Sequence, residues 1–369
     1  ALLRFDRFLS GLPAGIQLFS LLKSNPNLLL LFVEIMSAAP RLAEIIAARA
    51  HIVDGMLDPA LLTEIPTRDY LAGRLEAFMA GAEIYEERLD RLRIFTAEQR
   101  FLIGIRLLTG ATGGFAAGRA LTVLATLAID EALAGVLSGI EQSHGKLEGQ
   151  RVTVLAMGKL GSAELTAGSD VDVIVLYDCD DPLGSSDGPK SLDAPRYFGR
   201  VTQRLVAALS APTAEGVLYE VDMRLRPSGN AGPLATHLAA FEKYQLNDAW
   251  TWEHMALSRA HPLCGDASLM KDAAAVIDAV LVKPRDRGTL ARDIAEMRAR
   301  IERDKPAKSI WDLKLIAGGL VDIEFIAQFC HLGSEQPREK AGGGEAMSTD
   351  DVLVRFGPEF MNAGDLEAC

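Results

Sequence analysis

Two aspartates that lie one residue apart open an apolar run near the middle of the chain. Asp170 and Asp172 stand in GSDVDVIVLY, just before a series of β-branched residues. Side chains at positions i and i+2 of a strand share one face, roughly 6.5–7 Å apart along the chain. Carboxylates placed in this way repel each other unless a cation lies between them, and Mg²⁺ prefers oxygen ligands. The pair therefore indicates a magnesium site.

A third aspartate follows in VLYEVDMRLRPSG, where apolar and polar residues alternate. The alternation predicts a half-buried strand whose polar face carries Asp222, Arg224 and Arg226. Three carboxylates can bind two metal ions about 3.5–4 Å apart, which clamp the attacking and the leaving oxygen in phosphoryl transfer. Because a guanidinium binds phosphate bidentately, we expect at least one arginine to pair with an aspartate or a phosphate.

A glycine-rich turn, MGKLGS, precedes the aspartate pair. We expect Gly161 and Ser162 to lead into a short helix over SAELTA with Ser162 as its cap, so that backbone N–H groups face an anion. The turn has neither the Walker GxxxxGK[ST] pattern nor the GxGxxG dinucleotide pattern. Lys159 either reaches a phosphate or is exposed. Phosphates together with metal ions favour phosphoryl or nucleotidyl transfer.

The elements that position these residues change in type along the chain. RVTVLAM (151–157) and residues 170–177 read as strands, residues 178–195 as a surface loop, and residues 196–209 as a helix. Helices are expected before them, with Pro26, Pro40 and Pro59 in first turns, and again after Pro233. The fold class is therefore α+β.

Composition excludes several classes of protein. The chain has 369 residues and a formal net charge of −12, which argues against a basic surface for nucleic acid. Its four cysteines form no CxxC pair, so a disulfide framework or zinc site is not expected. The apolar run 28–33 is too short to span a membrane, and no signal peptide opens the chain. We expect a cytoplasmic protein that binds neither nucleic acid nor membrane. The first residue is Ala rather than Met, as in a piece of a longer protein.

The order of Gly-Ser, the aspartate pair and a third strand-borne aspartate resembles the DNA-polymerase-β-like nucleotidyltransferase superfamily. Four longer segments resemble glutamine synthetase adenylyltransferases: MGKLGSAELTAGSDVDVIVLYD, APTAEGVLYEVDMRLRPSGNAGPLAT, AWTWEHMALSRA and DLKLIAGGLVDIEFIAQ. TAGSDVDVIV and AFEKYQLNDAWTWEH are similar to the C-terminal, adenylylating half of these bifunctional enzymes, and FDRFLSGLPAGIQLFSLLKSNPNLL resembles the helical linker between the halves. The resemblance weakens after about residue 332.

This resemblance implies a polymerase-β-like core, a mixed sheet with helices, flanked by N- and C-terminal helical bundles. Its domains would be a linker-like helical domain (1–112), a nucleotidyltransferase domain (113–268) and a helical domain (269–369) that is truncated relative to the family. The implied reaction transfers AMP from ATP to a tyrosine hydroxyl of glutamine synthetase, and pyrophosphate leaves. The PII signalling protein is an implied partner.

The resemblance also implies roles for individual residues. Asp170 and Asp172 would hold two Mg²⁺ ions, while Asp222 would complete the catalytic metal site and is the candidate general base. Gly161 and Ser162 would bind the β- and γ-phosphates. Two other activities remain open: phosphate-dependent removal of the adenylyl group, and a regulatory fragment without catalysis.

Other polar and aromatic residues of these segments have less specific signals. Glu253 either serves the nucleotide site or caps local structure. Trp250 and Trp252 are expected in the core, and His254 is not expected to be a ligand. Asp322 and Glu324 would face different sides of a helix surface, so a shared metal is not expected.

Overall fold

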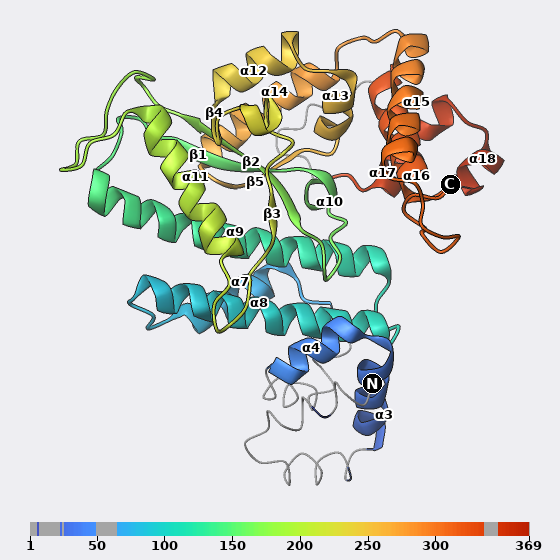
Figure 1. Ribbon diagram of the computed structural model, residues 1–369, viewed down its shortest axis with the longest axis horizontal. Helices are drawn as coiled ribbons and strands as arrows, with labels where there is room; N and C mark the ends of the chain where they lie inside the picture. Colours follow the sequence, from blue (N-terminus) through green and yellow to red (C-terminus); the bar gives the residue numbers. More distant parts are fainter. Residues whose placement is uncertain (1–5, 7–22, 24–25, 49–64, 336–345, 369) are drawn as a thin grey trace. The chain divides into compact units, whose positions relative to one another are not determined.

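The computed structural model describes residues 6, 23, 26–48, 65–335 and 346–368 (Figure 1). The chain forms two compact units. The first consists of Ala1–Ala132, Leu165–Ser169 and Ala208–Glu220, and the second of Leu133–Glu164, Asp170–Ala207 and Val221–Cys369. The residues predicted to form the site all lie in the second unit.

The first unit is helical in its described part, as expected for the N-terminal region. Its helices are α3 (Pro26–Ala38), α4 (Pro40–Ala48), α7 (Arg68–Met79), α8 (Tyr85–Leu108) and the first part of α9 (Gly114–His144). α3 and α4 begin at prolines, where a missing N–H costs nothing because the first helical N–H groups have no partner in the helix. The expected helix start at Pro59 and much of the linker-like segment lie outside the described residues.

Helix α9 is the one described helix that is long and apolar enough, by length and composition, to cross a membrane. Within its most apolar window, 61% of the residues are buried inside the protein. A buried core helix has the same length and composition, so α9 is weak support for a membrane span.

The second unit contains a mixed five-stranded sheet. Its strands are β1 (Arg151–Ala156), β2 (Val171–Asp178), β3 (Val221–Asp222), β4 (Ala235–His237) and β5 (His261–Gly265). The order is β3-β2-β1-β5, and β4 also pairs with β2. β1 is antiparallel to β2 and β5, whereas β3 and β4 run parallel to β2 along different parts of it. The expected mixed sheet with helices is confirmed.

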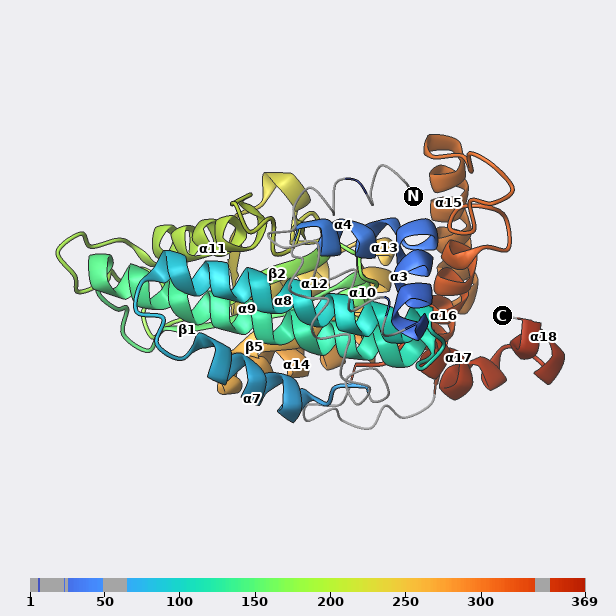
Figure 2. The same ribbon diagram turned by 90° about the horizontal axis from the view of Figure 1, so that it is seen from below.

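Helices surround this sheet and continue to the end of the described chain. They are α10 (Gly158–Gly161), α11 (Ala194–Ser210), α12 (Leu238–Asn247), α13 (Thr251–Leu257), α14 (Ala267–Leu281), α15 (Arg287–Asp304), α16 (Leu320–Gly333), α17 (Thr349–Phe356) and α18 (Ala363–Ala368). α12, α13 and α14 group over one face of the sheet in Figure 1, and α15, α16 and α17 lie side by side in both views (Figure 2). The main core of the unit joins sheet and helices through Leu155, Ile174, Phe241, Val280 and Leu332.

Two of the elements predicted after the aspartate pair are wrong. Only Val221 and Asp222 of the alternating segment pair as a strand, because the residues before them belong to the first unit and the chain turns after Asp222. β4 and β5 interrupt the region expected to be helical after Pro233. They have three and five residues, too few for a period to show, and β5 contains a proline.

The packing of Phe241 leads to a stability prediction. Phe241 on α12 is fully buried in the main core, so Phe241→Ala should lower the free energy of unfolding by about 3–5 kcal/mol. Urea unfolding followed by tryptophan fluorescence measures this change, because Trp250, Trp252 and Trp311 all lie in the second unit. The exposed Val282, changed to Ala, should alter the stability by less than about 0.5 kcal/mol. Equal stability of the two variants would contradict the prediction.

Candidate active site

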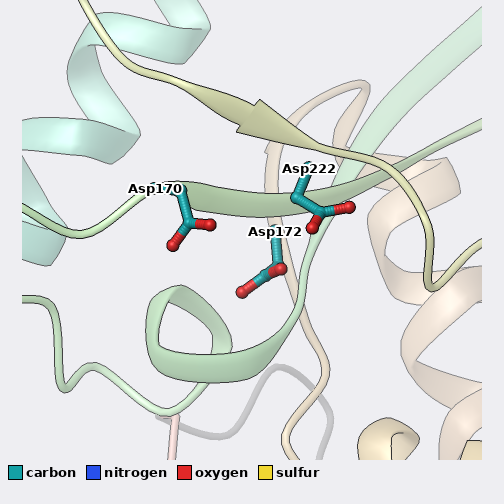
Figure 3. Close-up of side chains that lie close together, drawn as sticks. All are labelled: Asp170, Asp172 and Asp222. Carbon is teal, nitrogen blue, oxygen red and sulfur yellow. The ribbon is translucent and has the colours of Figure 1, made fainter. Parts of the chain in front are cut away.

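The parallel pairing of β2 with β3 brings the three aspartates together. Asp172 on β2 is the register partner of Asp222 on β3, and Asp170 directly precedes β2. One carboxylate oxygen from each residue lies within 4.8 Å of the others. Figure 3 shows the three side chains directed toward one region. The predicted cluster is therefore present, and its donor set of carboxylate oxygens suits a divalent cation such as Mg²⁺.

The charges of this cluster are poorly compensated at its centre. Burial, and then the charges of Asp170 and Asp222, raise the pKa of Asp172 to about 6. Arg259 and Arg224 partly oppose this rise. Asp222 behaves differently, because hydrogen bonds from Arg224 hold its pKa below the ordinary value.

The two arginines after Asp222 have different surroundings. The Arg224 backbone N–H donates to Asp222 Oδ1 at 2.8 Å, and its guanidinium donates to both oxygens of the same carboxylate. The Arg224 side chain is nevertheless 71% exposed. Arg226 is buried and donates to the backbone oxygens of Met223 at 2.7 Å and Pro233 at 3.1 Å. One arginine therefore pairs with an aspartate, as expected, but the shared strand face is wrong because β3 ends at Asp222.

Helix α10 approaches Asp172 closely at its first residue, where the backbone conformation favours glycine. Gly158 has φ of +54°, and a Cβ atom there would lie 2.6 Å from Asp172 Oδ2. At Gly161 a Cβ atom would lie 1.9 Å from the backbone oxygen of Arg259. The Gly161 N–H donates to Met157 O at 3.0 Å. The glycines of this turn thus have a packing role, whatever ligand the turn binds.

Ser162 follows α10 instead of capping a later helix, so the predicted helix over SAELTA is wrong. Its hydroxyl is buried, lies 2.6 Å from Glu164 Oε2 and 3.0 Å from Gly158 O, and accepts a hydrogen bond from Arg259 Nη2 at 2.8 Å. Lys159 is half-buried on α10. Phosphate binding by Lys159, Gly161 and Ser162 stays a prediction.

Arg259 is the residue near the site that the motifs missed. Its guanidinium forms ion pairs with Glu164 at 3.0 Å and Glu324 at 3.2 Å, and its side chain is only 12% exposed. A single arginine after a helix carries no periodic or spacing signal. Only its position in AWTWEHMALSRA, one of the family-like segments, could have drawn attention to it.

Glu253 serves as a helix cap in the structure. It accepts hydrogen bonds from the Trp250 N–H at 2.9 Å and from the Tyr244 hydroxyl at 2.7 Å, so its carboxylate satisfies the N–H of the N-cap residue of α13. Trp250 and Trp252 are 70% and 38% exposed, so their expected place in the core is wrong. A role of Glu253 in nucleotide binding stays a prediction.

The remaining candidates have local partners. His254 Nε2 is 2.9 Å from Gln245 O, and burial lowers the pKa of its ring. Asp322 and Glu324 on α16 each pair with a different arginine, Asp322 with Arg298 and Glu324 with Arg259. The two acids therefore take part in separate ion pairs and are not plain helix-surface residues.

The raised pKa of Asp172 predicts that its charge costs stability. The folded protein holds this proton more tightly than the unfolded chain, so the cost is absent below the ordinary pKa of 3.8 and complete above about pH 6. In cation-free buffer near pH 7.5, Asp172→Asn should stabilise the protein by up to about 3 kcal/mol, since one pKa unit corresponds to about 1.4 kcal/mol. Thermal unfolding measures the gain, which should shrink as the pH falls toward about 4. An equal gain at all pH values would contradict this assignment.

The close contact at Gly158 predicts a second outcome. Gly158→Ala introduces strain at positive φ and pushes the Asp172 carboxylate aside, so the affinity for Mn²⁺, measured by electron paramagnetic resonance, should fall about 10-fold or more. Gly199→Ala in α11 is the matched control, because nothing lies within 4 Å of the added Cβ. Unchanged Mn²⁺ binding by a folded Gly158→Ala protein would count against a cation site at Asp172.

The sequence of the chain is similar to one protein family and to several curated proteins. The sequence profile of the glutamate-ammonia ligase adenylyltransferase family matches residues 29–276. A bifunctional glutamine synthetase adenylyltransferase/adenylyl-removing enzyme of Agrobacterium fabrum (strain C58 / ATCC 33970) is 66% identical over 332 residues, which are 90% of this chain and 34% of the relative. The protein of the same description from Rhizobium meliloti (strain 1021) is 60% identical over 367 residues, 100% of this chain and 37% of the relative.

The chain thus spans about a third of the length of the curated relatives that it matches. The matched region contains Asp170, Asp172 and Asp222 together with the sheet that positions them. It also covers more than half of the chain. The chain belongs to the glutamate-ammonia ligase adenylyltransferase family.

Proposed function

We propose that this chain transfers AMP from ATP to a tyrosine hydroxyl of glutamine synthetase. The observation that carries the proposal is the register of β2 and β3, which brings the Asp170, Asp172 and Asp222 carboxylates within 4.8 Å. The descriptions of the relatives, which include adenylyl transfer to glutamine synthetase, support the choice of substrate. The acidic net charge agrees with a protein target and not a nucleic acid.

The three aspartates would hold magnesium, and we propose two ions. Their oxygens form the hard, anionic donor set that Mg²⁺ prefers. Burial and the charges of Asp170 and Asp222 raise the pKa of Asp172, and a bound cation would offset these charges. Bound Mg²⁺ neutralises phosphate charge and lowers the pKa of an attacking hydroxyl.

The proposed reaction forms one bond and breaks one bond at the α-phosphorus of ATP. The tyrosine oxygen bonds to this phosphorus, the bond to the bridging oxygen of the β-phosphate breaks, and pyrophosphate leaves. The tyrosine proton would pass to Asp222. Because Arg224 lowers the pKa of Asp222, this carboxylate becomes a better proton acceptor when Arg224 moves to another partner. A substrate phosphate is a suitable partner for the exposed guanidinium.

Phosphate-dependent removal of AMP is the second candidate, because the relatives are described as having both activities and this chain spans about a third of their length. The same aspartates would serve this step: a phosphate oxygen bonds to the phosphorus of the AMP group, the bond from this phosphorus to the tyrosine oxygen breaks, and ADP and the free tyrosine hydroxyl result. We propose glutamine synthetase and the PII signalling protein as partners and the cytoplasm as the location.

Transfer of label from ATP tests the proposed function. Incubation with α-³²P-ATP, Mg²⁺ and unmodified glutamine synthetase should label the synthetase. Asp170→Asn and Asp222→Asn should each lower the rate about 100-fold or more, because each removes charge stabilisation worth several kcal/mol and about 1.4 kcal/mol is tenfold in rate. Asp69→Asn, an exposed change on α7, should leave the rate within about twofold.

Two further arms separate the alternatives. Release of ADP from adenylylated glutamine synthetase and inorganic phosphate, without labelling of the unmodified enzyme, would favour AMP removal. Calorimetry that detects no Mg²⁺-ATP binding by the folded protein would support a fragment without catalysis. Labelling that persists in both aspartate variants would remove them from the catalytic residues.

A further inference from the structure

Arg259 connects segments of the second unit that are far apart in the sequence. Its Nη2 donates to Ser162 Oγ at 2.8 Å and to Glu164 Oε2 at 3.0 Å, while its Nη1 lies 3.2 Å from Glu324 Oε1. The three charged side chains are between 12% and 23% exposed. One guanidinium therefore holds the turn after α10 and the first half of α16 at the same time.

Glu164 extends this network to α17. Its two carboxylate oxygens accept hydrogen bonds from the backbone N–H and the hydroxyl of Thr349, each at 3.1 Å, in addition to those from Arg259 and Ser162. Glu324 and Thr349 both lie beyond residues 29–276, the part of the chain that matches the family profile. The nucleotidyltransferase region is thus joined to the C-terminal helices by defined polar contacts.

The turn that Arg259 contacts is the segment beside the aspartates, Gly158–Glu164. The Arg259 backbone packs against Gly161, where a Cβ atom would lie 1.9 Å from the Arg259 oxygen. Gly158 at the other end of α10 packs against Asp172. The backbone N–H groups of residues 161–164 all donate within the turn, to the oxygens of Met157, Gly158, Leu160 and Lys159. Movement at Arg259 would therefore reach Asp172 through a short, hydrogen-bonded turn.

We propose that Arg259 is a positioning residue that fixes the Gly158–Glu164 turn beside Asp172 and, through Glu324 and Thr349, makes this turn depend on α16 and α17. The proposed effect of Arg259 on nucleotide binding rests on the proposed function. The restraint of the turn by Arg259 does not rest on it, because the order of the turn is measurable without nucleotide. A change in the C-terminal helices would then alter the site without any contact to the substrate.

Hydrogen–deuterium exchange of the full chain, without nucleotide, tests the positioning role. Arg259→Gln should speed exchange in peptides covering residues 157–164 about 10-fold or more, because it removes the charged donor that restrains the turn. Glu324→Gln keeps the shape of the side chain and removes its charge, so it should produce a smaller increase in the same peptides. This second variant keeps the test valid if Arg259→Gln does not fold.

Arg298→Gln is the matched control. Arg298 on α15 pairs with Asp322, two residues before Glu324 on the same helix, and donates its other described hydrogen bond to Leu315 O, not to the turn. The Arg298→Gln variant should lower the melting temperature by an amount similar to that caused by Glu324→Gln, and it should leave exchange in residues 157–164 unchanged. Binding of Mg²⁺-ATP, measured by calorimetry, should weaken about fivefold or more in Arg259→Gln but not in Arg298→Gln.

Each outcome decides one part of the proposal. Unchanged exchange of the turn in both Arg259→Gln and Glu324→Gln would overturn it, even if both proteins melt at lower temperature. Faster exchange in Arg259→Gln alone would overturn the dependence on α16. If exchange is faster in both variants and the wild-type protein does not bind Mg²⁺-ATP, the positioning role is supported and the proposed function is rejected.

Discussion

Mutual repulsion of three carboxylates is the constraint on which the candidate site depends. Side chains alone would separate Asp170, Asp172 and Asp222, so the backbone must hold them within 4.8 Å. The parallel register of β2 with β3 does this, since it sets Asp222 beside Asp172 through main-chain pairing that is indifferent to charge. Burial first, and then the charges of Asp170 and Asp222, raise the pKa of Asp172. A site held under such repulsion is prepared to bind cations.

The surrounding residues limit this repulsion in two ways. Arg224 compensates Asp222 directly from an exposed position, so its guanidinium can exchange one anionic partner for another. Arg259 acts from a buried position and is itself held between Glu164 and Glu324. One arginine is thus suited to respond to a substrate and the other to maintain the geometry. The glycines of α10 allow Arg259 to maintain the geometry, because Gly161 lets the turn pack against the Arg259 backbone and Gly158 lets it pack against the Asp172 carboxylate.

Local patterns predicted the strands β1 and β2, which are short runs rich in β-branched residues, and the helix α11. The alternating segment around Asp222 shows the limit of this reasoning. Its period of two matches a strand, yet only two residues find a partner, since pairing requires a neighbouring strand that the pattern does not contain. Trp250 and Trp252 are apolar by type but exposed, which residue type alone does not reveal.

The sequence by itself determined the chemistry available to this protein. The types and spacing of Asp170, Asp172 and Asp222, and the motifs around them, identified both a candidate cation site and the family, because these features depend on residue identity along the chain. Only the tertiary structure decided which distant residues meet. The register that pairs Asp172 with Asp222, the burial that raises a pKa and the network of Arg259 arise from contacts between segments far apart in sequence. The free energies of these contacts depend on the packing of the whole unit, which no local sequence pattern contains.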